Sequence, residues 1–294
     1  MKLEELLSEI DKIKIHKQKM IGASLKKPLL LLLLISRIEE GNGENNQFRF
    51  TEIEKDLDLL IRNFGGRNVN KSGPEQPFHH LNSSVIWDVK VPYGVEFDNK
   101  RTLSKSILRD PETYGYFEPT IFSLLQSDEQ SRARIVAYIL EKFWPETIQA
   151  DIRNYLQLSV GIIAQPMKKR NQLFAKEVLA NYRYRCGVCG FSSVFNSIPF
   201  GIDAAHVFWH AYGGPDDVSN GIALCKTHHW ALDRGVITIK PKTFEIVVSP
   251  RFVAQENNSI AVLEQLNGTF ITGIREIPPS GYFLEWHNEN VYVR

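Results

Sequence analysis

Cysteine is scarce in this chain, with three copies among 294 residues. All three, Cys186, Cys189 and Cys225, fall in one histidine-containing stretch, so none is left over for a disulfide framework. Disulfides are typical of secreted proteins, whereas clustered cysteines in a reducing compartment more often serve a metal as thiolates. The sequence therefore predicts a chain in a reducing compartment whose cysteines bind metal.

Long apolar runs are also missing. The one suspicious stretch, residues 28–35, is far shorter than the roughly 18–20 apolar residues that a membrane span needs, and Lys27 and Arg37 flank it. We predict a buried core helix with Pro28 in its first turn, where the absent N–H costs nothing. Charged residues from Lys2 onward interrupt any early apolar run, so no secretory signal is expected.

A strong charge of either sign is absent as well. The net charge is +1, from 35 basic and 34 acidic residues, so bulk charge gives no evidence for nucleic acid. Its distribution gives a weak indication, because residues 166–185 contain one anion, Glu177, and six cations: Lys168, Lys169, Arg170, Lys176, Arg183 and Arg185. Such a run is usually a solvated face, and alone it supports DNA contact only weakly.

The length favours two domains, each with its own core. The first half shows a helical pattern over 3–13, the Leu-rich helix, and a helix over 52–63 that Thr51 and Glu54 would cap. Residues 74–81 resemble a turn that feeds a strand over 85–89, an outline typical of a winged helix. Further helices are expected over 119–125, 128–143 and 146–157. We place the boundary between domains 1–160 and 161–294 in the segment 160–166.

The second half changes character. A helix is expected over 171–181, a strand over 202–208, a helix over 222–233 that Gly235 ends, and a hairpin from strands over 236–239 and 244–248. These elements would form a ββα unit around one metal site. The fold class is therefore α+β, with a mainly helical, winged-helix-like first domain and a zinc-stapled ββα second domain.

Two short chelating pairs carry the metal prediction. The first is Cys186 with Cys189, and the second is Cys225 with either His228 or His229. Three thiolates and one imidazole suit tetrahedral zinc, and four protein ligands leave no open position for water, so the zinc would be structural. The alternative is three unrelated buried cysteines and surface histidines.

A His…Asn…His series is interleaved with these ligands. Phosphodiester hydrolysis needs a base, a cation for the developing charge, and a group that holds the base. His206 is the candidate base, because the pKa of histidine lies near neutrality. Asn220 can hydrogen-bond the backbone or the imidazole that positions His206, and His229 can bind a second divalent ion. For each residue taken singly there is an alternative without a catalytic role: His206 as an ordinary strand histidine, and Asn220, which precedes Gly221, as a turn residue.

The same residues resemble a known family. Residues 184–189, Asp203-Ala204-Ala205-His206, Asn220-Gly221, 224–229 and 232–235 resemble HNH endonucleases of the ββα-metal type, and more narrowly the zinc-bearing HNH domains of modification-dependent restriction enzymes similar to McrA. The resemblance covers about 170–250, with a similar tail at 282–287. It implies His206 as general base, Asn220 as its positioner, His229 on a catalytic Mg²⁺ or Mn²⁺, and four ligands on structural zinc: Cys186, Cys189, Cys225 and His228.

One departure concerns the residue before the base. Many HNH enzymes have an acid or histidine there, and this chain has Ala205. Asp203 is the nearest carboxylate, but a spacing of three in a regular strand directs it to the face opposite His206 unless a bulge or strand end intervenes. Asp203 is kept as a candidate ligand of the catalytic ion.

The first half resembles another domain. Lys27-Pro28-Leu29-Leu30-Leu31, Phe64-Gly65, residues 74–81 and Trp87 resemble the sulfur-binding domain of phosphorothioated-DNA-dependent restriction endonucleases, which in that family precedes an HNH domain. Sulfur is less hydrated than oxygen, so an apolar pocket takes it at a smaller desolvation cost. The candidates are His80 as pocket wall, Tyr116 and Pro119 as its apolar side, and Arg62 and Arg109 as phosphate partners. The alternative is that the aromatic residues belong to the core and the arginines are solvated.

Together these features predict a bacterial, cytoplasmic type IV restriction endonuclease that recognises phosphorothioate-modified double-stranded DNA and hydrolyses phosphodiester bonds nearby. Cutting both strands would favour a homodimer. Two alternatives stay open. One is an HNH nuclease that reads a modified base, which would need a pocket for a flipped base. The other is a non-catalytic zinc-stapled DNA-binding protein.

Overall fold

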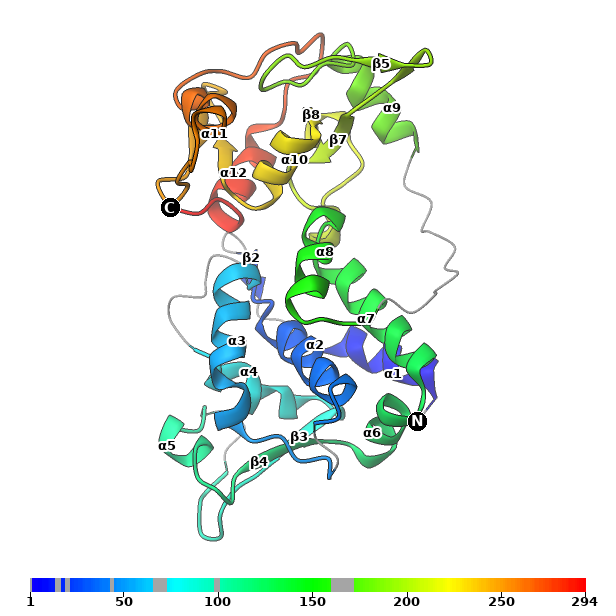
Figure 1. The fold of residues 1–294 in the computed structure, drawn as a ribbon, viewed down its shortest axis with the longest axis vertical. Helices are drawn as coiled ribbons and strands as arrows, with labels where there is room; N and C mark the ends of the chain where they lie inside the picture. Colours follow the sequence, from blue (N-terminus) through cyan, green and yellow to red (C-terminus); the bar gives the residue numbers. More distant parts are fainter. Residues whose placement is uncertain are drawn as a thin grey trace. The chain divides into compact units, whose positions relative to one another are not determined.

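The computed structural model describes residues 2–13, 17–18, 22–42, 45–65, 73–97, 101–159 and 172–294. By its internal contacts the chain divides into two compact units (Figure 1). Residues 1–18 and 23–164 form unit 1, and residues 19–22 and 165–294 form unit 2. The predicted boundary segment, 160–166, lies outside the described residues.

Unit 1 is mainly helical, as predicted. The elements of the first half are, in chain order, α1 Leu3–Lys12, β1 Lys17–Gln18, β2 Gly22–Ala23, α2 Lys26–Glu39, α3 Phe50–Phe64, α4 Glu75–His80, η2 Leu81–Ser83, β3 Trp87–Lys90, α5 Lys105–Leu108, β4 Tyr114–Phe117, α6 Pro119–Ser127, α7 Glu129–Phe143 and α8 Glu146–Tyr155.

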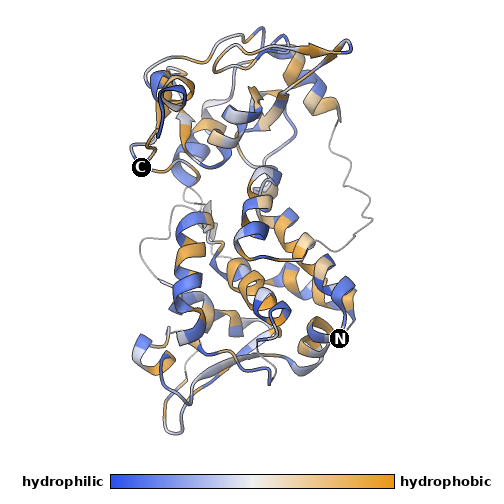
Figure 2. Ribbon diagram, viewed as in Figure 1, coloured by the Kyte–Doolittle hydropathy of each residue, from blue (hydrophilic) through white to orange (hydrophobic). Residues whose placement is uncertain are grey.

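The Leu-rich helix α2 is the centre of this unit. Its seven consecutive residues from Leu29 to Ile35 are each at most 3% exposed, and α3, α4, α6 and α7 all contact it. A helix that is apolar all round is buried by its neighbours. Figure 2 shows α2 as a largely orange helix surrounded by helices with blue outer faces. The prediction of a buried core helix is confirmed.

The antiparallel pair β3–β4 presents an apolar face to the helices. Trp87 pairs with Phe117 and both are buried, whereas the next pair, Asp88 and Tyr116, lies on the other face. The Trp87 indole donates to the Phe78 carbonyl oxygen at 3.0 Å, which joins β3 to α4. Trp87 and Phe117 therefore belong to the core.

Two local predictions in unit 1 are wrong. The segment 74–81 contains helix α4, Glu75–His80, with Pro74 as its N-cap, rather than a turn, because a proline within the first helical turn removes no helical hydrogen bond. Helix α3 begins at Phe50 with Arg49 as N-cap and no side-chain cap, so Thr51 and Glu54 form no capping box.

Unit 2 is built from short strands and helices. They are α9 Gln172–Asn181, β5 Val194–Phe195, β6 Ile198–Pro199, β7 Ile202–His206, η3 His210–Tyr212, η4 Val218–Asn220, β8 Gly221–Cys225, α10 Lys226–Asp233, β9 Ile237–Ile239, β10 Ile246–Val248, α11 Asn257–Val262, η5 Glu264–Leu266 and α12 Gly281–Asn290.

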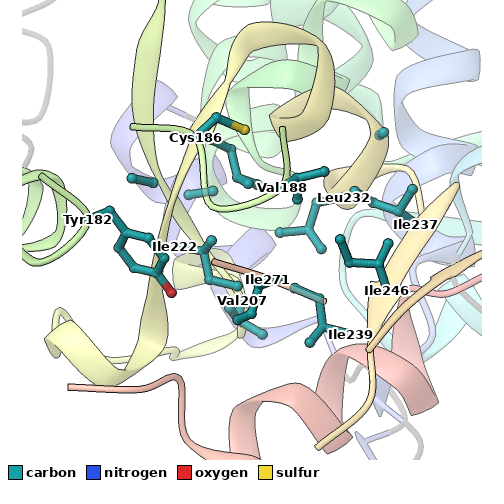
Figure 3. Packing of buried hydrophobic residues seen from close by; sticks show 14 of the residues in the cluster. Tyr182, Cys186, Val188, Val207, Ile222, Leu232, Ile237, Ile239, Ile246 and Ile271 are labelled. Carbon is teal, nitrogen blue, oxygen red and sulfur yellow. The ribbon is translucent and has the colours of Figure 1, made fainter. Parts of the chain in front are cut away.

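A ββα unit stands at the centre of unit 2. Strands β7 and β8 pair antiparallel, with Asp203 opposite Leu224 and His206 opposite Gly221, and α10 follows β8 directly. Residues 222–225 are thus strand and not helix, since a short apolar run does not distinguish the two. Helix α9 packs against both strands, and Figure 3 shows Ile222, Val207, Leu232 and Ile237 in the shared core.

The two units together confirm the α+β fold class, with a mainly helical first part and a second part of small strands around a Cys₃His cluster. Among the described residues, no helix combines the length and the apolar character that crossing a bilayer requires.

Candidate functional site

Four predicted metal ligands meet in unit 2. Cys186 and Cys189 lie on the turn after α9, Cys225 ends β8, and His228 is in the first turn of α10. Their ligand atoms all lie within 4.8 Å of one another. Of the groups of histidine, cysteine, aspartate and glutamate in the described part of the chain, this one converges on a single point in this way.

The distances between the ligand atoms bracket those of a tetrahedral zinc site. The Cys189 and Cys225 Sγ atoms are 4.0 Å apart, and His228 Nδ1 lies 3.1 Å from Cys225 Sγ and 3.5 Å from Cys186 Sγ. Ligands at about 2.3 Å for sulfur and about 2.0 Å for nitrogen place tetrahedral neighbours roughly 3.5–3.8 Å apart. His228 Nε2 faces the Val262 carbonyl oxygen at 3.0 Å, the outer contact that commonly orients a metal-bound imidazole. His228, and not His229, is therefore the histidine of this candidate zinc site.

The electrostatics of the thiols also favour a cation. The pKa of Cys186 is lowered, first by its hydrogen bond with Cys225, whereas the pKa of Cys225 is raised, first by Cys186. Burial raises the pKa of Cys189. The protein alone thus stabilises one thiolate at the expense of its neighbours. A divalent cation would allow all three to ionise.

His206 ends strand β7 and is held on two sides. Its Nε2 lies 2.9 Å from Asp216 Oδ1, and its ring stacks on Phe174 of α9 with centroids 4.0 Å apart. Because the Asp216 carboxylate accepts a hydrogen bond from Nε2–H, the lone pair stays on Nδ1, the atom that can take up a proton.

Burial lowers the pKa of His206 below its ordinary value of 6.5. The hydrogen bond to Asp216 and the charge of that carboxylate raise the pKa in part, and the electrostatic interaction with His210 and His229 lowers it again. His206 is therefore neutral at neutral pH and can act as a base.

Asn220 is fully buried and bonds backbone rather than an imidazole. Its Oδ1 accepts from Phe208 N at 2.8 Å, and its Nδ2 donates to Phe208 O at 3.0 Å and to Pro215 O at 2.9 Å. These bonds close the loop between β7 and η4, and Asp216 follows Pro215 directly. Asn220 thus fixes the segment that presents Asp216 to His206.

The same loop depends on a glycine. A Cβ on Gly214 would lie 1.9 Å from the Phe208 carbonyl oxygen that Asn220 bonds. Helix α12 supports the loop from outside, where Trp286 stacks on Phe208 with ring centroids 4.3 Å apart and packs edge-on against Trp209 and Tyr212. The aromatic tail noted in the sequence therefore helps to hold the loop of His206.

His229, on α10, faces two carboxylates. Its Nδ1 lies 3.1 Å from Asp203 Oδ2, and its Nε2 lies 3.3 Å from Oδ2 of the buried Asp233. Asp203 also pairs with Lys226, whose Nζ lies 2.7 Å from Oδ2. Burial raises the pKa of Asp203, but the hydrogen bonds from His229 and Lys226 outweigh that effect and hold the pKa at about 2.

The pair formed by Asp203 and His229 has the spacing of two neighbouring ligands. Two atoms at about 2.1 Å from an octahedral ion are roughly 3 Å apart, close to the 3.1 Å between Nδ1 and Oδ2. With an ion bound, a proton on Nε2, facing Asp233, would leave Nδ1 free to act as the ligand atom in place of its hydrogen bond to Asp203. The side chain of Asp203 contacts α10, whereas that of His206 contacts α9 and the loop that carries Asp216.

The five residues predicted for the sulfur pocket lie in unit 1. His80 ends α4, is half-buried, and bonds Thr102 Oγ1 through Nε2 at 2.8 Å. The Tyr116 hydroxyl donates to Asp88 at 3.2 Å, and Pro119 is the exposed first residue of α6. A polar cavity of about 520 Å³ near the end of α2 is lined by none of the five.

Both arginines of that prediction are exposed and engaged. Arg62 bonds Asp58 on the same helix, and Arg109 forms a two-pronged ion pair with Glu54. Exposed ion pairs contribute little to the stability of the fold. Exchanging these carboxylates for phosphates would therefore cost little free energy.

Sequence reasoning missed four side chains of the site in unit 2. They are Phe174 under the His206 ring, Asp216 on its Nε2, Lys226 on Asp203, and Asp233 on His229. The positions of Lys226 and Asp233 were detectable in the sequence. They lie three residues before and four residues after His229, and such spacings bring helical side chains to one face. Asp216 had no such signal beyond its place in the loop between His206 and Asn220.

The matches to family models define the class of protein. Residues 186–240 match the model of HNH endonucleases, and residues 3–160, more than half of the chain, match the model described as the ScoMcrA-like DNA sulfur-binding domain. A DNA sulfur-binding domain thus precedes an HNH endonuclease domain. The chain belongs to the ScoMcrA-like DNA sulfur-binding domain family, which confirms the family predicted from the sequence.

Several solved structures resemble this chain at low sequence identity. The sulfur-binding domain of SprMcrA complexed with phosphorothioated DNA is 16% identical, with a TM-score of 0.45, over 54% of this chain and 95% of that chain. The corresponding ScoMcrA domain is 17% identical, with a TM-score of 0.42, over 51% and 97%. The whole phosphorothioation-dependent type IV enzyme ScoMcrA is 16% identical, with a TM-score of 0.36, over 51% of this chain and 30% of that one. No curated protein matches the chain.

Proposed function

We propose that this protein binds phosphorothioate-modified double-stranded DNA through its first domain, residues 1–160, and hydrolyses nearby phosphodiester bonds with a metal-dependent HNH site in residues 161–294. One observation carries the proposal. A His206–Asp216 pair and a His229–Asp203 pair lie in the ββα unit beside the Cys₃His cluster, within a chain whose first half belongs to a DNA sulfur-binding family.

In this proposal His206 is the general base. Its Nδ1 takes the proton of the attacking water while Nε2–H remains bonded to Asp216, so the carboxylate stabilises the imidazolium that forms. Stacking on Phe174 fixes the ring plane. Asn220 contributes by fixing the loop of Asp216, which makes it a positioning residue.

Asp203 Oδ2 and His229 Nδ1 would hold the catalytic Mg²⁺ or Mn²⁺. When bound, such an ion offsets the charge that develops on the phosphate oxygens. Two protein ligands are few, but Mg²⁺ commonly keeps water and substrate phosphates in its remaining positions. Asp233 would orient His229, and Lys226 would balance the charge of Asp203.

The Cys₃His cluster would hold structural zinc, because its four protein ligands leave no open position. Phosphate contacts near the HNH site would come from three exposed cations in or just after α9: Lys176, Arg183 and Arg185. Lys168, Lys169 and Arg170 lie outside the described residues. His80, Tyr116 and Pro119 with Arg62 and Arg109 remain our candidates for the sulfur site, and a cytoplasmic location remains a prediction.

The Asp216→Asn variant tests the pair on His206. Activity needs neutral His206, so it is present above the pKa of His206 and is lost as the pH falls through it. Asparagine removes the charge that raises this pKa, so the acidic limb of kcat/KM moves to lower pH. We also expect a roughly 10- to 100-fold lower rate at neutral pH, because the tautomer is no longer fixed.

A pH–rate profile from about pH 5 to about pH 9 measures both effects. Asp217→Asn is the matched control, since Asp217 bonds Ser219 and not His206. An acidic limb that stays in place, or moves to higher pH, would exclude Asp216 as the partner of the base.

Chelation separates the two metals. We expect EDTA to stop cleavage before zinc leaves, because three thiolates and an imidazole hold zinc far more tightly than two ligands hold Mg²⁺. Adding Mg²⁺ or Mn²⁺ should then restore cleavage with the zinc content unchanged. Cleavage that persists after all divalent ions except zinc are removed would argue against a second ion at Asp203 and His229.

His80→Ala tests the sulfur site. The variant should bind a duplex with one phosphorothioate less tightly, by roughly tenfold, and bind the plain duplex as before. Arg62→Ala is the contrasting variant, because losing a phosphate partner weakens binding to both duplexes and reduces the salt dependence. If His80→Ala keeps full discrimination, His80 does not line the pocket. If the wild type binds methylcytosine duplexes more tightly than phosphorothioate duplexes, the alternative function is favoured, in which the first domain recognises a modified base.

A further inference from the structure

The hairpin β5–β6 carries an unusual apolar surface. Of its ten residues from 191 to 200, all but Ser193 are exposed. The apolar side chains among them are exposed at Phe191 43%, Val194 67%, Phe195 67%, Ile198 67% and Phe200 61%. Figure 1 shows this hairpin as an extension of unit 2 near α9. An isolated two-stranded hairpin is marginally stable in water, so such a surface is expected to be covered.

The surface carries no charge at all. From Cys186 to Ile202 the chain has no Asp, Glu, Lys, Arg or His. Binding to the DNA backbone depends on cations that neutralise phosphates, and this hairpin offers none. An interface between two copies related by a two-fold axis brings like residues near each other, where charges would repel. The composition therefore favours a second copy of the same hairpin over DNA.

The two backbone edges of the hairpin differ in their hydrogen-bond donors. Phe200 N donates to Ser193 O at 2.9 Å, so Ser193 and Phe200 form a hydrogen-bonded pair. Such pairs alternate with non-bonded ones, so the next pair, Val194 and Pro199, turns its backbone groups outward. Pro199 has no N–H to donate, whereas Val194 has one. The β5 edge therefore offers both a donor and an acceptor at Val194, and two β5 strands can pair antiparallel about a two-fold axis.

The size of the surface is near what a dimer needs. Phenylalanine side chains bury about 150–250 Å² each, so the five partly exposed side chains present roughly 500–600 Å² over the two faces of the hairpin, because Val194 and Phe195 point to opposite faces. A stable protein interface buries about 800 Å² per partner. Backbone pairing and the neighbouring serines would supply much of the remainder. A dimer of moderate affinity is the expected outcome.

We propose that the β5–β6 hairpin is a self-association surface through which two copies of this chain dimerise by their HNH units. Gly201 alone separates the hairpin from β7, the strand that ends in His206. If the proposed function holds, the dimer places two HNH sites next to one shared interface, so that one complex can cut both DNA strands.

The test is sedimentation velocity of the full chain with its zinc, from about 1 to about 100 µM. The wild type should dimerise, and Phe195→Glu and Ile198→Glu should each weaken dimerisation at least about tenfold by placing like charges across the two-fold axis. Val253→Glu is the matched control, because Val253 is 69% exposed outside the hairpin, and it should dimerise like the wild type. Unchanged zinc content and melting temperature show that the variants are folded.

Three results would overturn the proposal. The first is a wild type that stays monomeric throughout, and the second is a set of hairpin variants that dimerise as well as the wild type. The third is a monomeric wild type whose DNA affinity falls on the Phe195→Glu substitution, which would mean that the hairpin binds DNA. A plasmid assay adds the link to function, since the monomeric variants should nick at about the wild-type rate but convert fewer circles to linear DNA. If no variant and no wild type cleaves, the proposed function fails while the sedimentation result still decides the dimer.

Discussion

His206→Ala should abolish cleavage and leave DNA binding intact. Removing a general base typically costs about 100- to 10,000-fold in rate. His206 is the imidazole in unit 2 that is stacked on Phe174, bonded to a carboxylate, and left with a free Nδ1. DNA binding should persist because it depends on unit 1 and on exposed cations, which the substitution does not touch.

The measurement pairs a single-turnover cleavage assay with binding to the same duplex. His206→Gln is the conservative variant, which keeps a polar side chain near Asp216 but cannot take up the proton. His210→Ala is the neighbouring control, since its ring centroid is 5.7 Å from that of His206 and it lacks the Asp216 contact. Loss of binding together with cleavage, or loss of zinc from the His206→Ala protein, would mean that His206 is structural.

His228→Ala should unfold unit 2, and His229→Ala should not. A structural zinc site contributes roughly 10–16 kcal/mol in zinc-finger peptides, so losing one of four ligands removes much of the stability of a small module. His228 Nδ1 faces two thiols, whereas His229, the next residue, faces two carboxylates. We expect His229→Ala to retain zinc and its melting temperature but to lose cleavage and affinity for Mn²⁺.

Zinc analysis and thermal melting of the two variants make the comparison. Cys225→Ser should behave like His228→Ala, because the chain has only three cysteines and this one bonds in the same cluster. Loss of zinc from His229→Ala, or a zinc-depleted wild type that melts unchanged, would contradict the assignment of the cluster.

Spacing made much of unit 2 predictable. Two short chelating pairs identify a zinc cluster without any fold, because the loop lengths alone let each pair close on one ion. Spacing did not choose between His228 and His229, since both reach back from the helix to Cys225. The structure makes the choice through packing, because His228 is 3% exposed against the thiols and Val262, whereas His229 faces Asp203.

What spacing could not supply are contacts made by loops. Asp216 follows two glycines and a proline and belongs to no periodic pattern, so its place on His206 depends on the backbone bonds of Asn220. Similarly, the apolar run 222–225 is compatible with a buried helix, but it forms a strand that pairs with β7. The local sequence does not reveal this partner. In unit 1 the run at 28–35 was easy to interpret, while the pocket candidates His80 and Tyr116 depend on side-chain packing.

The most direct test of the account compares cleavage of three matched duplexes by the wild-type protein with Mg²⁺. They have the same sequence and differ in carrying one non-bridging sulfur, one methylcytosine, or neither. We expect the sulfur-containing duplex to be cut near its modification at least about tenfold faster than the other two. Equal rates on all three, or no cleavage of the sulfur-containing duplex with Mg²⁺ or Mn²⁺, would contradict the claim that this chain reads sulfur with one domain and cuts with the other.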